Sequence, residues 1–166
     1  FTRRIRRFEE VDGEIMTSRQ FAYLSNYAIY SSMFIYTIAF FSHAVEVAFS
    51  VRNIDDSTQF DFSKTDKAGR IGTAMMILGT IFLTAGVVLR GISAHRAPWG
   101  NMYEFSITGA MAFSIAYLFA LTKYKIRWLG LPIVISVLLT LGTAVAVLYR
   151  PSAPLVPALK STWLII

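Results

Sequence analysis

The stretch of sequence that decides the fold is residues 71–89, IGTAMMILGTIFLTAGVVL, which holds 19 residues and no charged side chain. At 1.5 Å per residue, a helix of this length covers about 28 Å, close to the thickness of the hydrocarbon core of a bilayer. Three more charge-free windows lie at residues 20–45, 105–122 and 128–149. A helix of a water-soluble bundle carries charge on its outer face at nearly every second turn. The sequence therefore predicts an all-α, polytopic membrane protein with four transmembrane helices and short connectors.

The predicted spans divide the chain into three parts. Residues 1–20 are expected to form a charged N-terminal tail, residues 21–150 a four-helix transmembrane domain, and residues 151–166 the start of an external, Pro-rich and amphipathic segment. The four spans are expected at about 21–50, 71–90, 102–122 and 128–149. We also expect a portion of a longer protein, because the chain begins with Phe and ends within an apolar run.

The composition excludes several kinds of chemistry. There is no Cys among the 166 residues, which excludes disulfides, thiol catalysis and zinc or iron–sulfur sites with Cys ligands. The net charge of +6 comes from bases that flank the apolar windows. Anionic lipid and membrane orientation account for bases at such places, so we expect contacts with anionic lipid and no nucleic-acid partner.

The shortest connector predicts the orientation of the chain in the membrane. Residues 123–127, KYKIR, contain three bases and no acid. Bases in short connectors mark the cytoplasmic side of a membrane. This places residues 123–127 in the cytoplasm and the connector 91–103 outside.

Small residues recur at helical spacing in two of the predicted spans. They are Gly72, Gly79 and Gly86 in the second span and Ala112, Ala116 and Ala120 in the third. Small residues on one face of a helix let a neighbouring helix approach closely. Both rows are predicted to be packing seams without chemistry.

Aromatic residues form a stripe along the first span, at spacings of three, four and seven. They are Tyr23, Tyr27, Tyr30, Phe34 and Phe41. We interpret the stripe as helix packing together with a belt of tyrosines at the membrane interface. The alternative is an aromatic wall for a cofactor.

The chain has two histidines, and the predicted spans place them at opposite faces of the membrane. His43 lies near the end of the first span, and His95 lies in the second connector. A self-contained cytochrome b needs histidines that face each other across helices, so that function is disfavoured. Glu46 follows His43 by three residues, which puts an imidazole and a carboxylate on one helix face. This pair is either functional, as ionisable residues inside a span usually are, or a hydrated pair near the interface.

Most candidate chemistry lies in residues 90–105, RGISAHRAPWGNMYEF. Asn101 is expected to cap the third span, and Glu104 to reach back as in a capping box. Capping does not account for the remaining polar and aromatic residues, which are Arg90, His95, Arg96, Trp99 and Tyr103. Imidazoles ligate iron, arginines pair with carboxylates such as haem propionates, and aromatic rings cover flat macrocycles. The residues alone therefore predict an external, aromatic loop that attracts anions.

This loop resembles the CcsA/ResC-type cytochrome c biogenesis proteins of system II, called CcsB in actinobacteria. The resemblance is carried by Arg90, by HRAPWGNMYEF at residues 95–105, by HAVE at residues 43–46 and by LVPALKSTWL at residues 155–164. It covers nearly all of residues 21–166 and corresponds to the N-terminal portion of such a protein.

The resemblance implies a function in haem delivery. Proteins of this family work with a ResB/Ccs1-like membrane subunit to carry haem b across the membrane and attach it covalently to apocytochrome c. The expected location is the bacterial inner membrane or the thylakoid membrane. The tryptophan-rich haem-binding signature of the family and its external histidines are absent from these residues. We therefore assign no catalytic residue here and expect no catalysis by this portion alone.

The resemblance also implies a set of haem-binding residues. They are His43, Arg90, His95, Arg96, Trp99, Asn101, Tyr103 and Glu104. Arg90, His95 and Arg96 are expected to orient haem propionates or a bound partner, and the residues from Asn101 onward to hold the loop in shape. His43 is the expected ligand of the haem iron.

An alternative function is that of an accessory or structural subunit of a respiratory membrane complex without its own haem. It predicts no haem on purification and no loss of cytochrome c when the gene is deleted. A small-molecule transporter is disfavoured, because we find neither convincing internal repeats nor broken helices.

Overall fold

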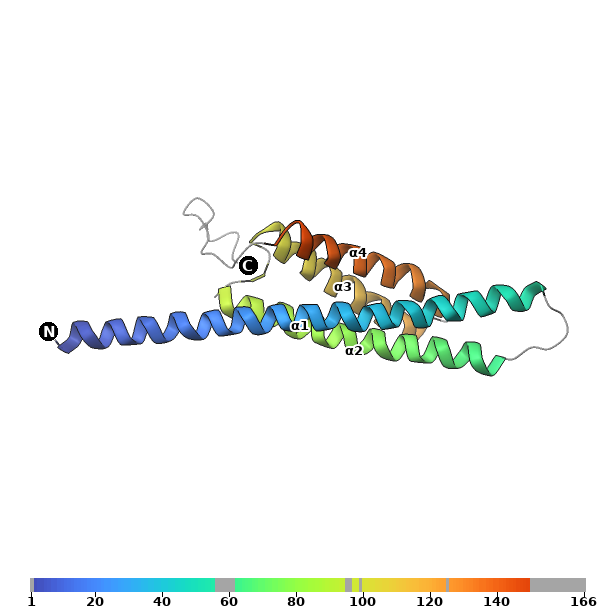
Figure 1. The fold of residues 1–166 in the computed structure, drawn as a ribbon, viewed down its shortest axis with the longest axis horizontal. Helices are drawn as coiled ribbons and strands as arrows, with labels where there is room; N and C mark the ends of the chain where they lie inside the picture. The colour runs from blue at the N-terminus through green and yellow to red at the C-terminus, as the bar shows by residue number, and fades with distance from the viewer. Residues whose placement is uncertain (1, 56–61, 95–96, 99, 125, 150–166) are drawn as a thin grey trace.

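In the computed structural model, the described residues form four long helices and one short 3-10 helix (Figure 1). In chain order they are α1 (Thr2–Asp55), α2 (Phe62–Ala94), α3 (Met102–Lys123), η1 (Arg127–Leu129) and α4 (Gly130–Ala146). The structure describes residues 2–55, 62–94, 97–98, 100–124 and 126–149, and within these ranges the side chains of residues 20–50 and of residues from 67 onward. No strand occurs in the described ranges. The predicted all-α class is confirmed.

Each of the four long helices contains a segment long and apolar enough to cross a membrane. The segments are Gln20–Ser50, Lys67–Ala94, Met102–Lys123 and, with the 3-10 helix included, Arg127–Ala146. The prediction of four transmembrane helices is therefore confirmed, and the protein is a multi-pass membrane protein. The division into tail, transmembrane domain and C-terminal segment stays a prediction. In the structure, α1 begins at Thr2 and runs without a break into the first span, and residues 150–166 lie outside the described part.

Successive helices run in opposite directions. Figure 1 shows α1 and α2 side by side along the length of the bundle, with α3 and α4 packed together on one side of that pair. The contact between α1 and α2 is the most extensive in the bundle. We call the end of the bundle at residues 97–101 the loop end, and the end at residues 123–127 the turn end.

Three glycines of α2, spaced seven residues apart, form its seam against α1. A Cβ added at any of these glycines would come within 3.3 Å of a side chain of α1. The facing pairs are Gly72 with His43, Gly79 with Tyr36, and Gly86 with Ile29. The glycines are spaced seven residues apart along α2, and their partners are spaced seven residues apart along α1 in the reverse order. This is the pattern expected for antiparallel helices with a regular register. The predicted glycine seam is confirmed.

The alanine row of α3 does not form a seam inside this bundle, and that prediction is wrong. Ala112 and Ala116 are exposed. The buried face of α3 instead includes Tyr103, Glu104 and Ser114. Polar side chains in a membrane helix turn toward the protein interior, because an unpaired polar group in lipid is costly. The polar residues, and not the alanines, therefore decide which face of α3 packs inward.

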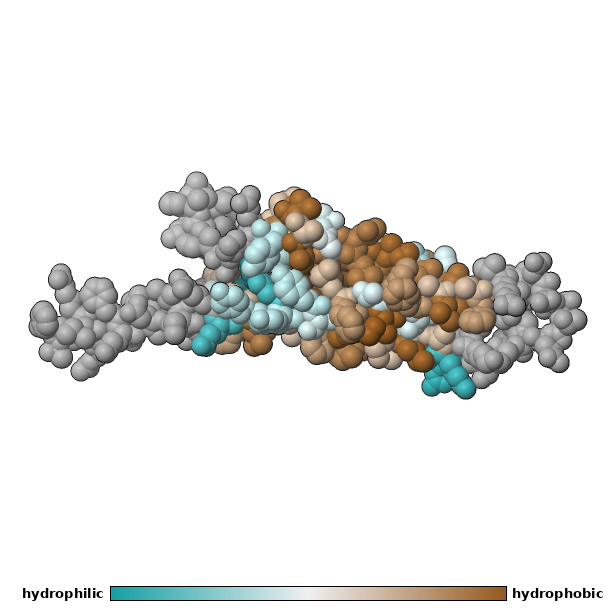
Figure 2. Space-filling view, in the orientation of Figure 1, coloured by the Kyte–Doolittle hydropathy of each residue, from teal (hydrophilic) through white to brown (hydrophobic). Residues whose placement is uncertain are grey.

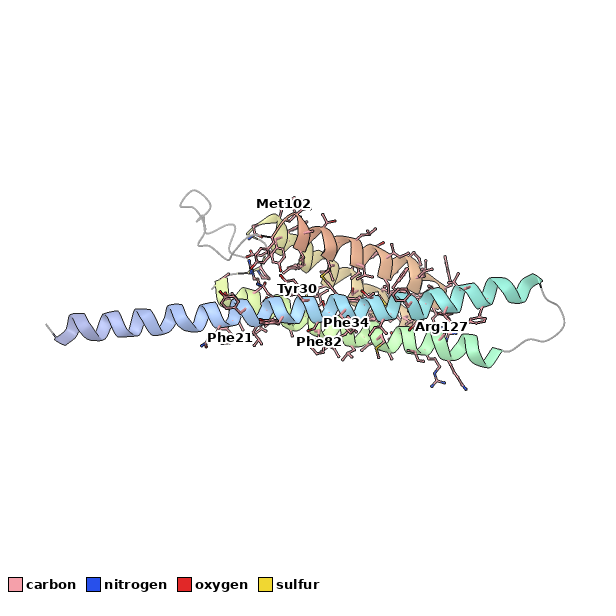
Figure 3. All side chains as sticks on the ribbon, in the orientation of Figure 1. Phe21, Tyr30, Phe34, Phe82, Met102 and Arg127 are labelled. Atoms are coloured by element: carbon pink, nitrogen blue, oxygen red, sulfur yellow. The ribbon has the colours of Figure 1, made fainter. Side chains whose placement is uncertain are left out.

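The aromatic stripe of α1 also faces away from the bundle. Its five side chains are exposed by 46 to 69%. Figure 3 labels two of them, Tyr30 and Phe34, together with Phe21. Figure 2 shows a mainly hydrophobic surface over the middle and the turn end of the bundle and a more polar surface toward the loop end. The stripe lies outside the packed core of the described residues, so helix packing within this bundle does not account for it and that part of our interpretation is wrong.

A polar contact in the middle of the bundle ties three helices together. The hydroxyl of Tyr36 on α1 lies 2.9 Å from the Thr80 hydroxyl of α2. It also donates to the Ser114 hydroxyl of α3 at 3.0 Å. All three side chains are buried, so each hydroxyl finds its partner within the protein.

Candidate functional site

Ionisable side chains are buried at both ends of the bundle. In Figure 3, Met102 marks the loop end and Arg127 marks the turn end. At the loop end, Arg90 of α2 meets Glu104 of α3, and at the turn end, His43 and Glu46 of α1 meet Arg127 of η1. His43 and the loop therefore lie at opposite ends of the bundle.

The ion pair at the loop end is almost completely buried. The Nε of Arg90 lies 3.5 Å from the Oε1 of Glu104, and the two side chains are 1% and 0% exposed. The Tyr103 ring stacks on the guanidinium, with its centroid 5.0 Å from the Cζ of Arg90. Breaking such a pair by removing one partner leaves an uncompensated buried charge. The pair thus fastens the end of α2 to the beginning of α3.

The start of α3 is held by a cap that also includes the loop. Asn101 is the N-cap, and its Oδ1 accepts a hydrogen bond from the backbone N–H of Glu104 at 2.8 Å. The other Glu104 oxygen, Oε2, accepts from the backbone N–H of Gly100 at 3.1 Å. One turn later, the Thr108 hydroxyl donates to the backbone carbonyl of Pro98. A single carboxylate therefore joins α2, α3 and the loop.

Helix α1 and the residues that follow α4 also contribute to the loop-end cluster. The Tyr103 ring meets the Tyr149 ring edge-on, with centroids 5.3 Å apart. The Asn26 side chain of α1 donates to the Tyr149 hydroxyl at 2.9 Å. Neither Asn26 nor Tyr149 was among the site residues predicted from the sequence. The sequence did contain a signal for this contact. Asn26 is a polar residue near the start of the first predicted span, and Tyr149 lies at the end of the fourth span, on the same side of the membrane.

Three of the predicted haem-binding residues, His95, Arg96 and Trp99, lie outside the described part of the structure. The structure brings together four others, which are Arg90, Asn101, Tyr103 and Glu104. These four join the end of α2 to the start of α3. The guanidinium of Arg90 faces Glu104 and Tyr103 within the bundle.

The turn-end cluster is a row of three ionisable side chains. The Nδ1 of His43 lies 3.0 Å from the Oε2 of Glu46, so the two share one helix face as predicted. The second Glu46 oxygen, Oε1, accepts from the Nε of Arg127 at 2.8 Å. The side chains of His43, Glu46 and Arg127 are 1%, 11% and 37% exposed. The sequence analysis missed Arg127, because its partner is 81 residues away and no local spacing relates the two.

Two glycines lie against the His43 ring. A Cβ added at Gly72 of α2 would lie 2.9 Å from the ring, and one added at Gly130 of α4 would lie 2.6 Å from it. The Nε2 atom is buried and has no hydrogen-bond partner among the described residues. A porphyrin would reach this nitrogen only if α2 or α4 moved away from the ring. No group of three or more His, Asp or Glu side chains that would hold a metal ion occurs in the described part.

The comparisons with known proteins point to one family. No family model and no solved structure matches the chain. The chain is 34% identical over 97 residues to the cytochrome c biogenesis protein CcsA of Marchantia polymorpha, a match of 57% of this chain and 30% of that protein. It is 32% identical over 98 residues to CcsA of Pyropia yezoensis, covering 57% of this chain and 31% of that protein.

A third relative matches the chain to a similar extent. CcsA of Dioscorea elephantipes is 37% identical over 93 residues, which is 54% of this chain and 29% of that protein. The chain thus spans about 30% of the length of the curated relatives that it matches. Over the matched region this chain is similar to CcsA, and the predicted resemblance to the CcsA/ResC-type cytochrome c biogenesis proteins is confirmed.

Proposed function

We propose that this chain is part of a system II haem lyase, the membrane machinery that carries haem b across the membrane and attaches it to apocytochrome c. The observation that carries the proposal is the buried Arg90–Glu104 pair, whose carboxylate also binds the loop backbone at Gly100. An ion pair sealed inside a membrane bundle is costly to build without a function. Here it fixes in place the loop that the CcsA resemblance assigns to haem.

In this proposal, the loop-end residues fall into two groups, one that supports the loop and one that contacts haem. Arg90 and Glu104 support the loop from within the bundle, helped by the cap at Asn101 and the ring of Tyr103. The residues that contact haem from the loop itself are His95, Arg96 and Trp99. Arg96 pairs with the propionates, His95 orients the haem or its iron, and Trp99 covers the macrocycle.

The orientation and the partners follow from the same proposal. The loop end faces the outside, where apocytochrome c receives haem, and the turn end with its bases faces the cytoplasm and anionic lipid. The membrane is the bacterial inner membrane or the thylakoid membrane. A ResB/Ccs1-like subunit completes the machinery, and this portion alone performs no covalent chemistry. His43 meets haem iron at the turn end.

Complementation of a deletion strain tests the proposal. The full-length protein with His95→Ala and Arg96→Ala together is expected to yield less haem-stained, covalent cytochrome c, because haem is no longer oriented at the loop. The matched control is Lys67→Ala with Arg70→Ala, which removes two exposed bases at the turn end. Normal cytochrome c in the deletion strain itself would reject the function. Normal cytochrome c in the loop variant alone would reject the role of His95 and Arg96.

A further inference from the structure

We infer that the turn end of the bundle, which Arg127 marks in Figure 3, carries a binding site for one anionic phospholipid. One acyl chain of the lipid lies in an apolar groove between α2 and α3, and its phosphate lies at Lys123, the last residue of α3. The site is at the opposite end of the bundle from the loop and takes no part in haem attachment. It therefore goes beyond the proposed function.

The groove opens where α3 parts from the rest of the bundle. The buried residues of α3 run from Tyr103 to Tyr117, and none of the residues from Leu118 to Lys123 is buried. A groove of about 510 Å³ lies there. It is lined by Ile77 of α2 and by five residues of α3, which are Ile115, Leu118, Phe119, Leu121 and Thr122. The described side chains therefore leave a space between α2 and α3 toward the turn end.

The lining of the groove suits an acyl chain. Five of the six lining side chains are large and apolar, and the hydroxyl of the sixth, Thr122, already donates to the backbone carbonyl of Phe119. Water needs several polar partners, and this lining does not supply them. Membrane helices approach each other closely over rows of Gly, Ala or Ser, and the lining contains none of these residues. A flexible hydrocarbon chain fits between bulky side chains without such a row.

Lys123 gives the site its preference for an anionic headgroup. Its Nζ lies 5.0 Å from the centroid of the Phe119 ring, and Phe119 lines the groove. The lysine side chain thus lies along the lining and holds its charge beside the groove. Lys123 is exposed, and no carboxylate pairs with it in the part of the chain that the structure describes. A phosphate that approaches Lys123 meets no competing acid there.

The surroundings of Lys123 are positively charged and lie at the level of the lipid headgroups. Residues 123–127 contain three bases and no acid. Glu46, the acid whose side chain is described at this end, is already bound to Arg127 and His43. Lys123 ends the third membrane-spanning segment, so its charge lies where the headgroups begin. Basic sites between membrane helices on the cytoplasmic side bind anionic headgroups, and the turn end faces the cytoplasm in the proposed orientation.

Native mass spectrometry of the full-length protein tests the headgroup. The protein in detergent is mixed with phosphatidylglycerol and phosphatidylcholine that carry the same acyl chains, and the lipids that stay bound are counted. We expect one phosphatidylglycerol to be retained in preference to phosphatidylcholine. Lys123→Gln should bind phosphatidylglycerol about fivefold more weakly, the usual effect of one base at a charged lipid surface, and Lys123→Arg should keep the affinity.

Lys67→Gln is the matched control for the charge. Lys67 is also exposed at the turn end, but ten residues, or about 15 Å along α2, separate it from Ile77 of the groove. Its loss should therefore leave the affinity for phosphatidylglycerol unchanged. The helical circular dichroism and the elution volume of each variant show whether it is folded.

A second pair of variants tests the groove. Leu118→Trp places a larger side chain in the groove and should release the bound lipid whatever its headgroup. Leu139→Trp is the matched control, because Leu139 is 66% exposed on α4 and does not line the groove. This variant should retain phosphatidylglycerol as the unaltered protein does.

The outcomes separate the lipid site from the proposed function. Equal retention of the two lipids by the unaltered protein, or unchanged affinity in Lys123→Gln, overturns the site. So does a folded Leu118→Trp variant that still retains the lipid, or an unaltered protein that retains no lipid because another membrane helix of the full-length protein covers the groove. A deletion strain with normal cytochrome c rejects the proposed function and leaves the lipid site standing.

Discussion

Arg90 and Glu104 face each other at 3.5 Å across the end of α2 and the start of α3, and neither side chain is exposed by more than 1%. The same carboxylate binds the loop at Gly100. A charge pair that water does not reach therefore joins the end of α2, the start of α3 and the backbone of Gly100.

Removing one partner of the buried Arg90–Glu104 pair should lower the free energy of unfolding more than replacing both partners. Arg90→Ala leaves the Glu104 carboxylate uncompensated in the interior and is expected to lower the free energy of unfolding by about 3–5 kcal/mol. The double variant Arg90→Met, Glu104→Leu replaces the pair by apolar side chains and should cost less than either single change. Unfolding in mixed micelles with increasing SDS measures all three. A double variant that costs the sum of the singles would show that the two residues are not coupled.

Removing the N-cap of α3 should lower the stability less than breaking the buried ion pair, and mainly at the start of α3. Asn101→Ala removes the acceptor of the Glu104 N–H and is expected to cost about 1 kcal/mol. Asn101→Ser keeps a capping oxygen and should restore most of that loss. Hydrogen exchange of the first amides of α3 is the measurement. Equal exchange in the alanine and serine variants would contradict the role of the cap.

The fold of this chain could be predicted largely from the positions of its charges. A helix that crosses a membrane needs an uninterrupted apolar stretch, and this requirement is local enough to read from residues 71–89 alone. The glycine seam was predictable for a similar reason, because a period of seven keeps one face of α2 against one neighbour. The predicted packing seam along the alanine row of α3 was wrong. A row of small residues permits packing, but the polar residues on the opposite face of α3 decide which face is buried.

The candidate site could be predicted only where its residues are close in sequence. Glu46 lies one turn from His43, and Asn101 lies three residues from Glu104, so helical spacing alone relates the members of each pair. Arg127 lies 81 residues further along the chain and meets Glu46 only because α3 brings the chain to the turn end, where η1 and α4 begin beside α1. No sequence spacing encodes a contact of that kind.

Tyr36 provides a test of the middle of the bundle. Tyr36→Phe removes the hydroxyl that joins the hydroxyls of Thr80 and Ser114, and it is expected to cost about 1 kcal/mol in the same unfolding assay. The control is Tyr27→Phe, because that side chain is exposed on the same helix. A cost for the control as large as that for Tyr36→Phe would show that the effect comes from tyrosine loss in general.

Gly130 tests whether the space around His43 is reserved for the imidazole. In Gly130→Ala, the new methyl group would stand 2.6 Å from the Cε1 of His43, so the ring or α4 must shift. We expect a loss of about 1–3 kcal/mol in the free energy of unfolding, as for other overpacked cores. Gly142→Ala is the control on the same helix. It meets nothing within 4 Å and should leave stability unchanged or raise it by up to about 1 kcal/mol, since alanine favours helix. If Gly130→Ala and Gly142→Ala have the same free energy of unfolding, the close contact between Gly130 and the His43 ring does not limit the size of residue 130.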